Sequence, residues 1–326
     1  MPSDTPQIMT PEEIDAIRAE VRAVIDAEGI AQTIVAKEAG IPYGTFTSWL
    51  GGTYAGRNDR LAGEARKWLR ERQVKAQTVA MAPEPPRFVA TPTAERIMVL
   101  LTQAKVLADF VVGVGQPGIG KTTAACQFTR SNTNVFKVVA HPTLSRPRAL
   151  LQQLARIVSV QASTGKLDLI HAALVSRLRG TGALIIVDEA NFLEPEALQQ
   201  LRSLHDQAEI GVALLGNATI HHNIEGRGRR AEFAQLTSRV GMRIDIRKPD
   251  RGDVETLLDA WGVMGDAERR HLRVIAAKPG ALRTMTKTLR LAHMLAAAER
   301  RRPSTADIAD AYAQLGAAPL SPAEAA

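Results

Sequence analysis

The chain has 326 residues, 41 Lys and Arg against 34 Asp and Glu, and 45% hydrophobic residues, which suffices for roughly two packed domains. A single cysteine, Cys126, excludes an intramolecular disulfide framework and a zinc site built on several cysteines. No stretch approaches ~18 uncharged apolar residues, and the N-terminus lacks the basic-then-apolar pattern of a secretion signal. We therefore expect a soluble cytoplasmic protein with no membrane partner.

Residues 1–75 are predicted to form a small helical domain. A first helix places three apolar residues on one face, namely Ile34, Val35 and Ala39. After a turn at Gly40, a second helix points Phe46, Trp49 and Leu50 inward. This pattern resembles a phage-repressor helix-turn-helix, and the side chains expected to meet DNA are Tyr43, Thr45, Thr47, Ser48 and the following Arg57. That helix carries no Arg, Asn or Gln for a bidentate base contact, so we expect weakly specific DNA contact, with protein contact as the alternative.

The rest of the chain is predicted to form a linker, an α/β core and a helical subdomain, in that order. Residues 76–93 contain four prolines and predict a linker. Residues 94–249 alternate amphipathic helical runs with five apolar strand candidates, typical of a parallel sheet: Phe110–Gly115, Val135–Ala140, Ala183–Asp188, Val212–Gly216 and Val240–Ile246. Residues 250–315 predict helices only, over Asp253–Trp261, Asp266–Ala277, Ala281–Ala298 and Thr305–Leu315. Residues 316–326 are expected to be a disordered tail.

The segment after the first strand matches G-x-x-x-x-G-K-[ST] and predicts a phosphate-binding loop. Glycines let the backbone curl so that N–H groups point at phosphate oxygens, the lysine adds a positive charge, and the threonine hydroxyl is suited to Mg²⁺. The ligand is therefore expected to be a nucleotide with Mg²⁺. Its predicted contacts are Gly115, Gln116, Pro117, Gly118, Ile119, Gly120, Lys121, Thr122 and Thr123.

Further polar residues stand where a nucleotide-hydrolysing site needs them. A buried strand ends in Asp188 and Glu189. Asp188 is predicted to hold Mg²⁺ together with Thr122, and Glu189 is predicted to polarise the attacking water. Asn217 ends the next strand and is predicted to position the water or read the γ-phosphate, with a helix cap as the alternative. Arg239 is predicted to reach a neighbouring subunit's nucleotide, in competition with Arg227, Arg229 and Arg230. Arg283 opens a helix of the last subdomain and is predicted to sense the nucleotide.

Positive charge gathers in the second half of the chain and favours a polyanionic partner. Residues 269–302 carry ten basic side chains and one acidic, a run suited to DNA or to a protein partner. Arg146 and Arg148 flank a proline just after the second strand and are predicted to face DNA.

These motifs, in this order and spacing, resemble AAA+ ATPases over roughly residues 91–315. The N-terminal module, the Pro-rich linker and residues 247–253 are similar to the phage Mu transposition protein B group. This resemblance implies slow, partner-stimulated ATP hydrolysis and largely sequence-nonspecific binding of double-stranded DNA by a helical oligomer that delivers target DNA to a transposase. The alternatives are a nucleotide-switched helix-turn-helix transcriptional regulator and a helicase-loader-like protein.

Overall fold

The computed structural model describes residues 9–81, 88–161, 165–220, 238–297, 299 and 301–316. The chain divides into two compact units, residues 1–84 and 85–326. Within the described ranges, no helix is long and apolar enough to cross a membrane.

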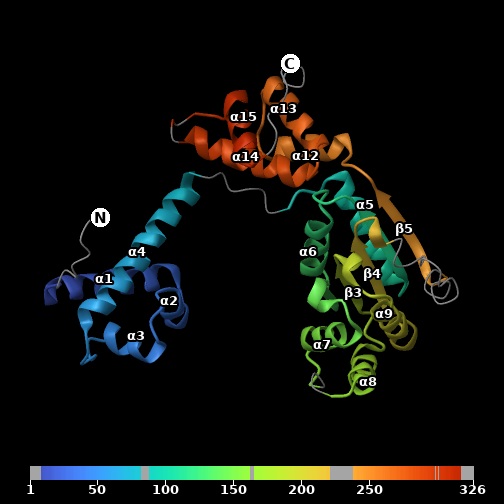
Figure 1. Ribbon diagram of the computed structural model, residues 1–326, viewed down its shortest axis with the longest axis horizontal. Coiled ribbons are helices and arrows are strands. Elements are labelled where there is room, and N and C mark those ends of the chain that lie inside the picture. The colour runs from blue at the N-terminus through green and yellow to red at the C-terminus, as the bar shows by residue number, and fades with distance from the viewer. Residues whose placement is uncertain are drawn as a thin grey trace. The chain divides into compact units, whose positions relative to one another are not determined.

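The N-terminal unit consists of helices around one apolar core (Figure 1). The helices are α1 (Pro11–Glu28), α2 (Gln32–Glu38), α3 (Tyr43–Leu50) and α4 (Asn58–Met81). Thr10 and Glu13 form a capping box that starts α1, and Gly29 ends it in the left-handed region (φ 62°). The inward side of α3 is as predicted, because Phe46, Trp49 and Leu50 are all buried.

Two expectations for this unit are corrected. Ile34 is 50% exposed, because the buried stripe of the short α2 runs through Val35, Ala36 and Ala39, which share one face. Helix α4 continues to Met81, inside the segment predicted as a linker, since the first proline of that segment is Pro83. The next helix already begins at Pro92, so the connection is shorter than the predicted 76–93.

The C-terminal unit contains the predicted five-stranded parallel sheet, in the order β2-β3-β4-β1-β5. Figure 1 labels its strands β3, β4 and β5. The strands are β1 (Phe110–Gly115), β2 (Val135–Val139), β3 (Leu184–Asp188), β4 (Gly211–Gly216) and β5 (Val240–Ile246). Gly115 pairs with Ile246, and Val114 pairs with Gly216. The carboxyl ends of the three neighbouring strands β4, β1 and β5 therefore lie at one edge of the sheet.

Helices cover both faces of this sheet because its strands are apolar on both sides. Along β1, Phe110 and Val112 pack in one core and Val111 in the other. The first core includes α7 (Pro147–Ile157), α8 (Leu167–Leu178) and α9 (Pro195–Ala208). The second includes α5 (Pro92–Val106) and α6 (Lys121–Ser131).

In the described residues after the sheet, every element is a helix, as predicted. These helices are α12 (Arg251–Ala260), α13 (Asp266–Ala277), α14 (Ala281–Ala297) and α15 (Thr305–Gln314), each within two residues of the expected bounds. Their shared core holds Leu258, Leu272, Met285 and Ile308. Capping boxes begin α12 (Asp250 with Asp253) and α15 (Ser304 with Asp307), which fixes where each helix starts.

Candidate functional site

A cavity of about 340 Å³ lies where the loop after β1 meets the C-terminal helices. Its walls come from four parts of the C-terminal unit: the segment before and at the start of α5, the loop with the start of α6, the residue after β3, and α12 and α14 with the residue that ends α12. The lining residues are Phe88, Val89, Thr91, Ala94, Pro117, Gly118, Ile119, Gly120, Lys121, Thr122, Thr123, Glu189, Leu257, Trp261, Leu282, Arg283, Thr286 and Lys287. The structure thus brings the predicted residues 117–123 together with Glu189 and Arg283, whereas the predicted Gly115 and Gln116 are not among the described residues that line the cavity.

The loop after β1 has the backbone of a phosphate cradle. Gly118 (φ 89°) and Gly120 (φ 104°) adopt left-handed conformations that favour glycine. Gly120 caps α6, so the N-terminal amides of that helix open into the cavity, which is a favourable position for an anion. Lys121 is buried and its Nζ donates to the carbonyls of Gly115 (2.6 Å) and Gln116 (2.9 Å). Burial lowers the pKa of Lys121, opposed by the nearby carboxylates of Glu189 and Asp188.

The backbone of the loop after β1 closely contacts the start of α14. The backbone N–H of Arg283 donates to the carbonyl of Gly118 (3.2 Å). A Cβ on Gly118 would overlap the carbonyl oxygen of Gly280 and lie 2.8 Å from its carbonyl carbon. This contact holds the start of α14, and with it Arg283, against the cavity.

The two carboxylates at the end of β3 have different surroundings. Asp188 is buried, accepts from the backbone N–H of Glu189 (3.1 Å) and forms an ion pair with Lys137 (3.5 Å). Glu189 adopts the left-handed region (φ 54°), which turns the chain at the strand end and brings this residue into the cavity wall. Sequence reasoning missed Lys137, although a lysine inside the apolar run of β2 is itself a signal of a buried anionic partner.

Asn217 occupies the end of β4 but its side chain is engaged locally. Its Oδ1 accepts from the backbone N–H of Thr219 (2.9 Å), and its own backbone N–H donates to Oδ1 of Asn191 (3.3 Å). Neither Asp188 nor Asn217 is among the described residues that line the cavity. The capping alternative for Asn217 is therefore the geometry seen, while its predicted contact with water or phosphate stays a prediction.

Arg239 lies at the opposite edge of the sheet from the loop. It precedes Val240, which pairs with Phe110 at the start of β1, about 17 Å from the loop along the strand. Its Nε donates to Asp206 of α9 (3.1 Å). This placement removes Arg239 from the nucleotide of its own subunit. Its competitors Arg227, Arg229 and Arg230 lie outside the described residues.

The apolar end of the cavity was not predicted from the sequence. Phe88 and Val89, from the segment predicted as linker, line it together with Leu257 and Trp261 of the C-terminal subdomain. A cavity with a cationic, amide-rich end and an apolar end fits a nucleoside triphosphate, whose phosphates and base need those two environments.

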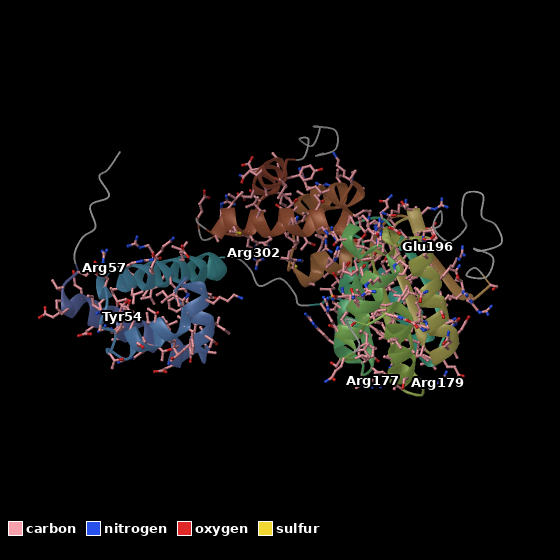
Figure 2. All side chains as sticks on the ribbon, turned by 60° about the horizontal axis from the view of Figure 1, so that its bottom comes forward. Tyr54, Arg57, Arg177, Arg179, Glu196 and Arg302 are labelled. Carbon is pink, nitrogen blue, oxygen red and sulfur yellow. The ribbon has the colours of Figure 1, made fainter. Side chains whose placement is uncertain are left out.

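The predicted DNA contacts of the N-terminal unit are only partly available. The hydroxyls of Thr47 and Ser48 donate to carbonyls of their own helix, those of Tyr43 (2.9 Å) and Gly44 (3.0 Å). Thr45 is half-buried, whereas Tyr43 is 52% exposed. The side chain of Arg57 is 75% exposed, lies at the surface of this unit (Figure 2), and pairs with Asp59 at 3.4 Å.

In the C-terminal unit, many cations are already paired. The side chain of Arg146 is 80% exposed and 3.5 Å from Glu194, and Arg148 donates to the carbonyl of Gly165 (3.3 Å). Arg179, at the periphery of this unit (Figure 2), donates to the carbonyl of Gln207. Among the described residues of the basic run 269–302, carboxylates of the same subdomain pair with Arg269, Arg273 and Arg301. The basic run therefore offers fewer free cations than its composition indicates.

Comparison with known proteins places the chain in a family. The family described as "Mu B transposition protein, C terminal" matches residues 238–315, and "AAA domain" matches residues 106–224. The "ATP-dependent target DNA activator B" of Escherichia phage Mu is 36% identical over 302 residues, 93% of this chain and 96% of that protein. The "Mu-like prophage FluMu DNA transposition protein B" of Haemophilus influenzae is 30% identical over 261 residues, 79% of this chain and 90% of that protein.

Among solved structures, the Drosophila ORC bound to DNA is similar in fold, with a TM-score of 0.52 and 16% identity. The match covers 74% of this chain and 65% of that chain. The parallel sheet, the cavity at its carboxyl edge, the helices that follow and the relatives agree: the chain belongs to the Mu B transposition protein family of AAA ATPases.

Proposed function

We propose that this protein is an ATP-dependent DNA-binding ATPase that selects target DNA and delivers it to a transposase. The observation that carries the proposal is the cavity in which the P-loop, Glu189 and Arg283 meet, in a chain 36% identical to an "ATP-dependent target DNA activator B". The phage relative supplies the biological role, and the cavity supplies the chemistry on which that role depends.

Within the cavity, each end binds a different part of the nucleotide. The apolar side chains of Leu257 and Trp261 take the base, and the amides at the start of α6 bind the phosphates. Lys121 Nζ exchanges its two carbonyl acceptors for phosphate oxygens, which are anionic and therefore stronger acceptors. Arg283, from the lid formed by α12–α15, adds a second cation to the wall of the same cavity.

Glu189 is the proposed general base, because it is the carboxylate that lines the cavity. Thr122 and Asp188 would hold Mg²⁺, which neutralises charge on the transferred phosphoryl group. Lys137 forms an ion pair with the buried Asp188 carboxylate. This pairing stabilises the fold, since burying an unpaired carboxylate costs several kcal/mol.

Arg239 is proposed to act on the nucleotide of a neighbouring subunit. It lies at the sheet edge remote from its own cavity, and its half-exposed side chain pairs with Asp206 at 3.1 Å. Contact in trans makes ATP binding and assembly interdependent. The resulting helical oligomer binds the DNA backbone through exposed cations such as Arg146. Binding to phosphates in this way requires no base recognition.

A Lys121→Ala variant tests the proposal. It is expected to lose ATP binding and, with it, ATP-dependent binding to random-sequence duplex DNA in gel shifts. Lys105→Ala is the matched control, because Lys105 Nζ also donates to two carbonyls, those of Thr133 (2.8 Å) and Gly182 (3.2 Å), away from the cavity. Tight ATP-independent binding to one short sequence would contradict the proposal and favour a transcriptional regulator.

A further inference from the structure

Asp253 lies at the junction of the α/β core and the C-terminal helices and is fully buried. It is the third residue of α12 and closes a capping box, since its Oδ2 accepts from the backbone N–H of Asp250 (2.7 Å). That local role needs only one of its oxygens. The remaining hydrogen bonds of the carboxylate leave its own helix.

Those bonds reach α5, 160 residues earlier in the chain. Asp253 Oδ1 accepts from the backbone N–H of Thr93 (2.7 Å), and Oδ2 accepts from the Thr93 hydroxyl (2.6 Å). The Thr93 N–H is one of the first-turn amides that a helix cannot satisfy internally. One carboxylate therefore caps two helices, and its negative charge lies near the positive end of both.

The two helices that Asp253 joins both contribute to the wall of the nucleotide cavity. Ala94, next to Thr93, lines it from α5. Leu257 and Trp261, four and eight residues after Asp253 and so on the same helix face, line it from α12. The first turns of the two helices also lie close together, since a Cβ on Gly252 would lie 3.0 Å from Cγ of Pro92.

We infer that Asp253 is a positioning residue for ATP: it sets the spacing between the α5 wall and the α12 wall of the base-binding end of the cavity. This inference rests on the proposed ATP binding. Without the charged clamp, α12 samples orientations in which Trp261 no longer meets the base, and apparent affinity falls with the fraction of competent molecules.

Asp253→Asn removes one acceptor at almost unchanged volume. Whichever way the amide turns, its NH₂ faces a backbone N–H, either that of Asp250 or that of Thr93, and one donor is left without an acceptor. Asp307→Asn is the matched control. Asp307 is also the third residue of a capped helix in the same subdomain, but its bonds go to Ser304 (2.7 Å) and Arg301, both local.

The experiment measures the dissociation constant of a fluorescent non-hydrolysable ATP analogue and the thermal unfolding of the nucleotide-free full chain. Asp253→Asn is expected to weaken binding about tenfold, in line with the loss of one charge-assisted hydrogen bond. Asp307→Asn is expected to lower the unfolding temperature while leaving the dissociation constant within about twofold of the parent.

Two variants of Thr93 keep the inference testable if Asp253→Asn does not fold. Thr93→Val removes the hydroxyl that donates to Asp253 and should weaken binding, whereas Thr93→Ser retains that hydroxyl and should bind as the parent does. Parent-like binding by both Asp253→Asn and Thr93→Val, or equal weakening by Asp307→Asn, would overturn the inference and leave the proposed function intact. A parent chain that binds no ATP would instead refute the proposed function, and this inference with it.

Discussion

The contact between Gly118 and Gly280 is a sensitive point of the fold. Gly118→Ala adds a methyl group that overlaps the backbone carbonyl of Gly280, and a backbone atom has no rotamer by which to move away. The start of α14 must therefore separate from the P-loop, which breaks the hydrogen bond from the Arg283 amide to Gly118 (3.2 Å).

Two contributions make up the expected loss of stability. The left-handed backbone at Gly118 (φ 89°) costs alanine about 1–2 kcal/mol. The lost hydrogen bond adds about 1 kcal/mol, so that the total is about 2–3 kcal/mol. Gly180→Ala isolates the first contribution, because Gly180 is also left-handed (φ 72°) but a Cβ there meets nothing within 4 Å.

Thermal unfolding of both variants without nucleotide, followed by titration with ATP, tests this reasoning. Gly180→Ala should lower the midpoint by a few degrees, at about 2–4 °C per kcal/mol for a unit of this size, and should bind ATP normally. Gly118→Ala should lower the midpoint further and weaken ATP binding, since Arg283 leaves the cavity wall. Equal midpoints for the two variants would show that the contact between the loop and α14 adds nothing to stability.

Three further changes have defined outcomes. Glu189→Gln should retain ATP binding and reduce hydrolysis at least about 100-fold, measured by phosphate release; hydrolysis at the parent rate would remove Glu189 as the base. Arg239→Ala should reduce DNA-stimulated ATP hydrolysis but not ATP binding by the isolated subunit. The control Asp206→Asn breaks the same ion pair but keeps the arginine, so it should hydrolyse ATP normally. Equal losses of hydrolysis in the two variants would mean that Arg239 has only a structural role. Burial lowers the pKa of His293 below its ordinary 6.5, so the unfolded chain takes up the proton more readily and stability should fall as pH decreases below about 6.5. His293→Phe should show a shallower loss than the parent between pH 7.5 and 5.5 in thermal unfolding, with His171 adding the same slope to both; identical slopes would contradict this assignment.

The sheet was predictable because parallel strands buried on both faces are continuous apolar runs. The P-loop was predictable for a related reason, since its function depends on consecutive residues whose backbone binds the ligand. The four C-terminal helices followed from apolar periodicity and clear capping residues such as Ser304. In each case the signal is local in the sequence.

The parts that were missed depend on residues far apart in the chain. Phe88 and Val89 follow a proline-rich stretch and have no periodic pattern, yet they line the cavity. The bonds from Asp253 to Thr93 span 160 residues, which no local pattern can reveal.

The number of unpaired cations in residues 269–302 was overestimated for the same reason. Counting residues 269–302 omits Glu255 and Asp259, which precede that run and pair with Arg269. Asp307, just after the run, pairs with Arg301. The paired arginines stabilise the helical subdomain, so the number of cations in a segment overstates what is free to bind DNA.

We propose that ATP bound at this cavity assembles the protein on DNA without regard to sequence. Electron microscopy of the purified chain with random-sequence duplex DNA and a non-hydrolysable ATP analogue tests it most directly. Helical filaments that require both ligands, and that Lys121→Ala fails to form, are the predicted result. A chain that stays monomeric when saturated with both ligands would contradict the account.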